Sequence, residues 1–386
     1  MNAIALPGVL AGGDERALRI VPFIATMMFL FAAWQFARRT VDAECACWLV
    51  GILAGAHPFV MYSGQLLSDL PSGACLLGAL AILIPELRRD DGPRYRLVAV
   101  APLLAASFYI RYGSCVTIAL IGAAAIAIGC RGIARRPLPV IATCLVFGTL
   151  LVPHIADSIR QTGSPLGILH ESASVPQKIP AGLADYFLTN PFVRYGVLVA
   201  PLIVVGALSL GRDRVLTVLQ IVAAGQILVL GVTTGAHTRF IYFAVVMLLV
   251  VGIATTRRAI MRAPYRTRIA LAAAAAGLVV SAWVVAIVVG VVMRERRVDY
   301  TVATRLAANA IRGDAHGEPC AASASATTQL EWYSRCPVVT RRSGRLPADR
   351  RAYAVVTDGS APPGATIFYA PGQVQVVRVA CPGACR

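Results

Sequence analysis

Residues 57–89 read HPFVMYSGQLLSDLPSGACLLGALAILIPELRR, and this stretch decides the fold. Its apolar part, residues 70–87, fits the roughly 17–25 residues that a helix needs to cross the hydrocarbon core of a bilayer. Because lipid offers the backbone no hydrogen-bond partner, an open chain can cross only as a helix. Asp69 stands at one end of this segment, and Arg88 and Arg89 stand at the other. We therefore predict a membrane-spanning helix between an acidic end and a basic end.

The rest of the chain has the same apolar character. Of its 386 residues, 57% are hydrophobic and 14% are charged, and the mean hydropathy is +0.69. A soluble globular protein carries roughly 25% charged residues, so lipid is the better match as solvent. We predict an α-helical polytopic membrane protein with about ten transmembrane helices, at residues 19–37, 45–62, 70–87, 97–111, 115–130, 138–156, 193–210, 215–232, 240–256 and 269–293.

The positive charge predicts orientation rather than nucleic-acid binding. The formal net charge is +17, but most arginines stand in short loops between the apolar runs. One alternating set of loops holds sixteen basic residues and the opposite set holds six. Cytoplasmic loops carry an excess of Lys and Arg, so we expect the Arg-rich loops inside and both termini outside. The expected protein is multi-pass in the plasma (inner) membrane, with membrane lipid as a partner and no nucleic acid.

The N-terminus raises a separate expectation. A chain that starts outside needs a segment that carries it there, and residues 1–13 lack the basic n-region of a signal peptide. We therefore expect a further span upstream of Met1.

Residues 294–386 predict a small α/β extracytoplasmic domain that follows a transmembrane domain at residues 1–293. Residues 352–358, 366–371 and 374–380 have the β-branched and aromatic composition of strands, and residues 326–336 read as a helix between two short strands. Four of the ten cysteines fall here, which favours disulfides in an oxidising compartment. Zinc is the alternative, although there is no C-x-x-C pair and His316 is the only nearby histidine. The disulfide candidates are Cys320, Cys336, Cys381 and Cys385, and their three pairings stay open.

Ionisable residues where spans emerge on the outer side are the candidates for chemistry, because charges at membrane depth are costly. Either Ser68 or Asp69 caps the helix, or Asp69 is a carboxylate that serves as general base or metal ligand. Arg239 and Arg111 are either interfacial anchors beside aromatic residues or phosphate-binding groups. His57 and His237 are either structural hydrogen-bonding groups or ligands.

Motifs of soluble enzymes do not occur in the chain. It has no phosphate-binding G-x-x-x-x-G-K loop, no G-x-G-x-x-G after a strand, no H-E-x-x-H and no G-x-S-x-G. A transporter or flippase should show paired repeats or broken helices at the membrane midplane, and no such repeat is evident.

The order of four stretches resembles the C-type superfamily of membrane glycosyltransferases. They are GGDERALRIVPFIATMMFLFAAWQFARRT (12–40), GAHPFVMYSGQLLSDLPSGACLLGAL (55–80), DSIRQTGSPLGI (157–168) and GAHTRFIYFAVVMLL (235–249). They are similar to glycosyltransferase family 39, which includes the protein O-mannosyltransferases and the lipid A aminoarabinose transferases. In that family, the first stretch ends the first outer loop, and the second carries an acidic residue that Asp69 matches.

The resemblance implies a glycosyltransferase that moves a sugar, with inversion, from a polyprenyl-phosphate donor to an acceptor on the outer face. It implies Asp69, Asp14 and Glu15 as catalytic candidates, and Arg239, Arg111, His57 and His237 as substrate-binding residues. A divalent metal, Mg²⁺ or Mn²⁺, is the one cofactor implied, with Asp69 as its ligand.

One departure from the family pattern suggests other functions. The family's principal catalytic Asp lies early in the first outer loop, and this chain begins inside that loop. The alternatives are therefore a non-catalytic truncated member or partner subunit, and a transporter or flippase.

Overall fold

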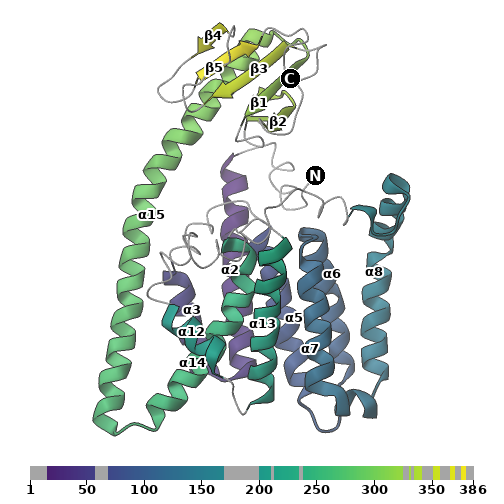
Figure 1. The fold of residues 1–386 in the computed structure, drawn as a ribbon, viewed down its shortest axis with the longest axis vertical. Coiled ribbons are helices and arrows are strands. Elements are labelled where there is room, and N and C mark those ends of the chain that lie inside the picture. Colours follow the sequence, from purple (N-terminus) through teal and green to yellow (C-terminus); the bar gives the residue numbers. More distant parts are fainter. Residues whose placement is uncertain are drawn as a thin grey trace. The chain divides into compact units, whose positions relative to one another are not determined.

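The computed structural model describes residues 15–56, 68–168, 200–209, 213–233, 238–324, 330–331, 334–340, 351–356, 366–369 and 375–379. The chain forms two compact units, Met1–Gly290 and Val291–Arg386 (Figure 1). The helices of the described chain are α2 (Glu15–Thr40), α3 (Ala43–Gly55), α5 (Asp69–Leu87), η2 (Tyr95–Ala99), α6 (Val100–Ile110), α7 (Ser114–Arg135), α8 (Leu138–Thr162), α12 (Ala200–Leu208), α13 (Arg214–Thr233), η5 (Thr238–Ile241), α14 (Tyr242–Met261) and α15 (Tyr265–Ala315).

Seven helices in the described part of the chain are long and apolar enough to cross a membrane. They coincide with the predicted spans that begin near residues 19, 70, 115, 138, 215, 240 and 269. The other three predicted spans correspond to shorter described helices, namely α3, the η2–α6 pair and α12. The predicted fold class, a polytopic helical membrane protein with a small C-terminal α/β unit, is confirmed.

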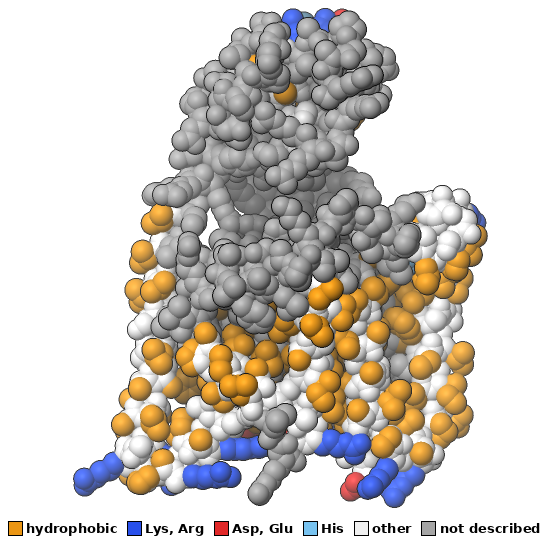
Figure 2. All heavy atoms as spheres, viewed as in Figure 1, with side chains coloured by type: hydrophobic (Ala, Val, Ile, Leu, Met, Phe, Trp, Pro, Cys, Tyr) orange, Lys and Arg blue, Asp and Glu red, His pale blue; other side chains and the backbone are white. Residues whose placement is uncertain are grey.

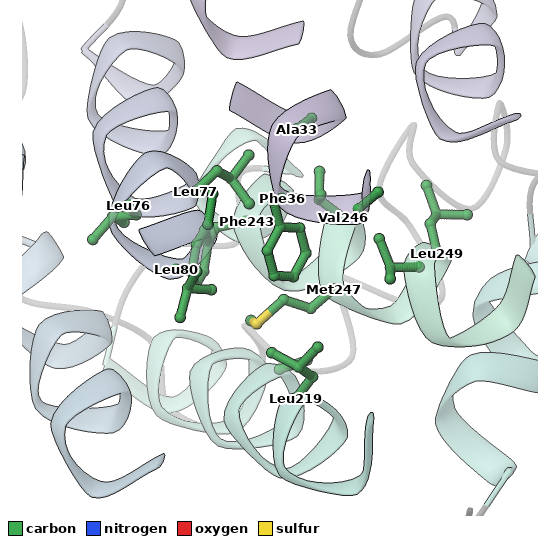
Figure 3. Packing of buried hydrophobic residues seen from close by; sticks show 14 of the residues in the cluster. Ala33, Phe36, Leu76, Leu77, Leu80, Leu219, Phe243, Val246, Met247 and Leu249 are labelled. Atoms are coloured by element: carbon green, nitrogen blue, oxygen red, sulfur yellow. The ribbon is translucent and has the colours of Figure 1, made fainter. Parts of the chain in front are cut away.

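Helix α5 is the centre of the first unit. It contacts α2, α6, α7 and α14, and most of its length is buried. Phe36 of α2, Leu77 of α5, Leu219 of α13 and Met247 of α14 meet in one apolar core (Figure 3). Because α5 is surrounded by other helices, the polar groups at its two ends contact neighbouring helices as well as solvent.

Helix α8 has the opposite character. Its apolar side chains point outward, including Ile141, Leu145 and Val152, and little of the helix is buried. Hydrophobic side chains cover much of the visible flank of the bundle, whereas Arg side chains gather at one end (Figure 2). An apolar flank with a basic end is what a bilayer-embedded bundle requires.

Helix α15 differs from the prediction of a span that ends at residue 293, because it continues to Ala315. The stretch 291–312 contains neither Gly nor Pro, so nothing in it breaks a helix. In the second unit, Ala307, Ala308 and Ile311 of this helix pack against Tyr353 and Val376 of the sheet.

The sheet has the order β2-β1-β3-β5-β4. Strand β1 pairs in parallel with β2 and with the central strand β3, and β5 pairs antiparallel with both β3 and β4. Residues 330–331 and 334 of the crossover between β1 and β2 are helical, as predicted. The strands are β1 (Cys320–Ala324), β2 (Val338–Thr340), β3 (Arg351–Val356), β4 (Thr366–Tyr369) and β5 (Gln375–Val379).

A disulfide joins Cys320, at the start of β1, to Cys336, just before β2. It closes the β1–β2 crossover, whose ends are separated by 16 residues. Cross-linking a loop of this length stabilises a fold by about 3 kcal/mol in the chain-entropy model. The other two cysteine candidates, Cys381 and Cys385, lie outside the described residues.

A buried tyrosine fastens the end of α15 to the sheet. The hydroxyl of Tyr353 donates to Asp314 Oδ2 at 2.7 Å, and Arg351 donates to the Asp314 carbonyl at 2.7 Å. Burial, together with the hydrogen bond to Asp314, raises the pKa of Tyr353 to about 12. The tyrosine therefore stays neutral and keeps donating to Asp314 throughout the physiological pH range.

Candidate functional site

Asp69 is the first residue of α5 and is almost fully buried. The N-cap of the helix is Ser68, whose side chain makes no capping hydrogen bond. Pro71 stands in the first turn, where a missing N–H costs no helical hydrogen bond. Asp69 is thus placed inside the bundle by the start of the helix, where groups from neighbouring helices can reach its carboxylate.

Arg111 is one such partner, and it comes from a tight turn between two other helices. It directly follows α6, and its own carbonyl accepts a hydrogen bond from the backbone of Ser114, the first residue of α7. Its Nη1 donates to Asp69 Oδ1 in an ion pair whose side chains are 20% and 5% exposed, respectively. The structure therefore joins two residues that the sequence nominated separately.

An aromatic ring covers this ion pair. The guanidinium carbon of Arg111 lies 4.3 Å from the centre of the Phe240 ring. A cation over an aromatic face is attracted by the ring quadrupole, more strongly where water is excluded. Phe240 belongs to η5, the short turn before α14, so Arg111 links α5 to the second half of the bundle.

Below the ion pair, three serine hydroxyls from three helices form a buried chain. Ser72 of α5 shares hydrogen bonds with Ser107 of α6 at 2.8 Å and with Ser114 of α7 at 2.7 Å. The sequence analysis did not identify these serines. Ser72 stands three residues after Asp69, on the same face of α5, and this spacing is the signal that could have identified it.

A small cavity of about 20 Å³ lies among these groups. Gln226 of α13 also lines it, and its buried Oε1 accepts no hydrogen bond from the described residues. The volume is that of a water molecule rather than a sugar. Its polar lining consists of Asp69, Ser72, Arg111, Ser114, Thr117, Gln226 and Tyr242.

A buried histidine lies near the Arg111 turn. His154 of α8 packs its ring 4.9 Å from that of Phe108 and 5.0 Å from that of Tyr112. Its Nε2 has no hydrogen-bond partner among the described residues. The sequence analysis gave this histidine no role.

The remaining predicted residues are described in part or not at all. Asp14, His57 and His237 lie outside the described residues. Glu15 is the first residue of α2 and Arg239 lies in η5, but only their backbones are described. Their predicted roles therefore stay predictions.

A metal site at Asp69 also stays a prediction. Among the described residues, no three His, Cys, Asp or Glu side chains come together. Around Asp69, the described donors are one carboxylate, already paired with a cation, and neutral hydroxyl and amide groups. Divalent cations favour several carboxylate or carbonyl oxygens, so this donor set is a poor fit for Mg²⁺.

Comparison with known proteins gives one family match and several structural matches. Residues 3–156 match the family model of dolichyl-phosphate-mannose-protein mannosyltransferases. This region includes both Asp69 and Arg111. No curated protein matches the chain significantly.

The structural matches extend over nearly the whole chain. ArnT from Cupriavidus metallidurans in the apo state aligns with a TM-score of 0.62 at 12% identity, over 97% of this chain and 86% of ArnT. ArnT from the same organism bound to undecaprenyl phosphate aligns with a TM-score of 0.64 at 13% identity, with the same coverage. At this identity the likeness establishes the fold, and together with the family match it confirms the predicted resemblance.

Proposed function

We propose that this chain, which has the fold of the C-type membrane glycosyltransferases, transfers a sugar from a polyprenyl-phosphate donor to an acceptor hydroxyl. The reaction takes place at the Asp69 end of α5. The observation that carries the proposal is the buried Asp69–Arg111 ion pair covered by Phe240. It places a base and an anion-binding group side by side, within the region that matches the mannosyltransferase family.

Asp69 is the proposed general base. An acceptor O–H gives its proton to the Asp69 carboxylate as the oxygen attacks the anomeric carbon of the sugar. The bond from that carbon to the phosphate oxygen breaks, and polyprenyl phosphate leaves with the bonding electrons. Attack opposite the leaving group inverts the anomeric carbon. General-base assistance of this kind contributes about 10²–10⁴-fold to a rate.

Arg111 is the proposed phosphate-binding residue. A guanidinium has five N–H donors, so Arg111 can pair with Asp69 and donate to a phosphate oxygen at the same time. Arg239 is proposed as a second phosphate-binding group, because its backbone directly precedes Phe240 in η5. Positive groups on the leaving phosphate stabilise the charge that develops there in the transition state. That ArnT has been crystallised with undecaprenyl phosphate supports a lipid phosphate as the donor class.

We also propose that the Asp69 end faces the outside and the Arg-rich end faces the cytoplasm. The distribution of arginines at one end of the bundle supports this orientation. A C-terminal unit that contains the Cys320–Cys336 disulfide supports an oxidising compartment for that unit.

The test is transfer by the purified protein in nanodiscs, with a panel of polyprenyl-phosphate hexoses and pentoses as donors. Asp69→Asn keeps the volume and an acceptor oxygen for Arg111 but removes the basicity. We expect kcat to fall by at least about 100-fold, with donor binding retained. Asp157→Asn is the matched control, because Asp157 lies toward the end of α8 and, within the described part of the chain, accepts only from Gln161 of its own helix, at 2.8 Å.

Two results would count against the proposal. Wild-type transfer by Asp69→Asn would exclude an essential carboxylate at this position. Donor binding without transfer by the unaltered protein would favour the non-catalytic member or partner subunit. In that case the Asp69–Arg111 pair would serve only to join α5 and α6.

A further inference from the structure

A second and much larger cavity lies at the opposite end of α5. Its volume is about 670 Å³, against about 20 Å³ beside Asp69. Arg88 lines this cavity, 19 residues after Asp69, which corresponds to about 28 Å along a helix. The cavity is therefore separate from the proposed transfer site. Its lining consists of Thr40, Val41, Asp42, Arg88, Asp213, Ala254, Arg257, Arg258, Met261 and Arg262.

The lining carries more positive than negative charge, since it includes four arginines and two aspartates. Asp213 lies between two of the arginines, with its oxygens 3.6 Å from Arg88 and 3.6 Å from Arg258. These distances are long for ion pairs, so one carboxylate holds two guanidinium groups loosely.

The other two arginines differ in their partners. Arg257 is paired with Asp42 and with Glu44, the latter at 2.6 Å. Arg262, after the last turn of α14, makes no ion pair with the described residues. The free capacity for an anion is therefore greatest around Arg88, Arg258 and Arg262.

A buried hydroxyl gives independent evidence for a ligand. Thr40, the last residue of α2, is 4% exposed and lines the cavity. Its Oγ1 has no hydrogen-bond partner among the described residues, whereas its carbonyl accepts from Arg88 at 2.9 Å. Buried polar atoms in native structures almost always have partners, so an unpaired hydroxyl beside a cluster of arginines indicates a missing polar ligand.

We propose that this cavity binds the phosphate of an anionic glycerophospholipid from the leaflet at the Arg-rich end. Guanidinium groups bind phosphate oxygens in a bidentate manner, and Thr40 Oγ1 would donate to a phosphate or glycerol oxygen. Val41, Ala254 and the exposed Met261 add apolar surface to the lining, which suits the glycerol end of the acyl chains. The cavity joins α2, α5, α13 and α14, so the lipid would bind where these helices meet.

The binding test uses the purified full-length protein in nanodiscs of phosphatidylcholine, with or without phosphatidylglycerol, and native mass spectrometry of retained lipid. We expect retained phosphatidylglycerol to fall about tenfold in the double variant Arg258→Gln/Arg262→Gln, because two charge-assisted hydrogen bonds are removed. Arg94→Gln/Arg135→Gln is the matched control. Both control arginines lie at the same end, bond to Asp91 and to the Asp90 carbonyl, and do not line the cavity.

Thr40→Val separates lipid binding from folding, because it keeps the shape and removes a hydroxyl that has no partner among the described residues. We expect it to weaken phosphatidylglycerol retention without lowering the melting temperature in phosphatidylcholine.

Equal loss of phosphatidylglycerol retention in the control variant Arg94→Gln/Arg135→Gln would overturn the proposal, since the attraction would then be a general property of the basic surface. Displacement of phosphatidylglycerol by millimolar inorganic phosphate would overturn the lipid source and assign the site to a soluble phosphate. The test measures lipid retention and not sugar transfer. If the proposed glycosyltransferase activity proved wrong, the lipid-binding result would still stand.

Discussion

The two ends of α5 handle charge in opposite ways. At the Asp69 end, a buried acid is paired with a partly buried arginine, and an aromatic ring covers the arginine beside a cavity of about 20 Å³. At the Arg88 end, partly exposed arginines outnumber the acids around a cavity of about 670 Å³. A buried charge needs a partner of its own, whereas an exposed charge is stabilised by water. We therefore expect the ion pair at the first end to contribute more to stability than the ion pairs at the second end.

The largest expected effect comes from breaking the buried pair on one side. Arg111→Met keeps a long apolar side chain but leaves the Asp69 carboxylate without its guanidinium. Removing one partner of a buried ion pair typically costs about 3–5 kcal/mol of stability. We expect a loss of that size in the free energy of unfolding, measured by denaturation in detergent.

A double variant shows whether the loss comes from the orphaned charge. In Asp69→Asn/Arg111→Met no unpaired carboxylate remains. The double variant should therefore be more stable than Arg111→Met and nearly as stable as Asp69→Asn. If the double variant is as unstable as the sum of the two single variants, the residues are not coupled. The two ends of α5 would then not differ in how strongly their ion pairs are coupled.

The middle-sized effect concerns the serine chain that supports the pair. Ser72→Ala removes the hydroxyl that bridges Ser107 and Ser114. A typical buried hydrogen bond contributes about 0.5–1.5 kcal/mol, and we expect a loss in this range. Thr149→Ala is the control, because Thr149 is exposed and, among the described residues, donates only to the carbonyl of Leu145 in its own helix. An equal loss in both variants would mean that the serine chain contributes nothing beyond ordinary helix packing.

The contrast between the two ends was only partly predictable from the sequence. Apolar runs of sufficient length identified the long helices, and the asymmetry of loop arginines identified the basic end. Asp69 and Arg111 were each nominated because an ionisable residue near lipid is costly. Their pairing was not predictable, because 42 residues separate them and the packing of α5 against α6 brings them together.

The site residues that the sequence analysis did not identify have small, neutral side chains. A serine or threonine in an apolar helix usually bonds to the backbone of its own turn, so Ser107, Ser114 and Thr40 give no signal individually. Only the three-dimensional contacts show that the serines meet across three helices and that the Thr40 hydroxyl has no partner in the described part of the chain. The cavity beside Thr40 could not be predicted either, because four separate stretches of the chain line it.

The smallest effect is expected from the open end. Asp213→Asn removes the carboxylate between Arg88 and Arg258 but retains a side-chain oxygen that can cap α13, where Asp213 now accepts from the backbone of Val215 at 3.0 Å. Partly exposed ion pairs of this kind contribute about 0–1 kcal/mol, so the stability should hardly change, and any loss should vanish at high salt. The same substitution frees two guanidinium groups and should raise, not lower, the retention of phosphatidylglycerol. A loss of several kcal/mol in the free energy of unfolding would contradict this prediction. It would show that the Asp213 carboxylate is needed to offset the repulsion between the arginines of the open end, and that the two ends of α5 do not differ in this respect.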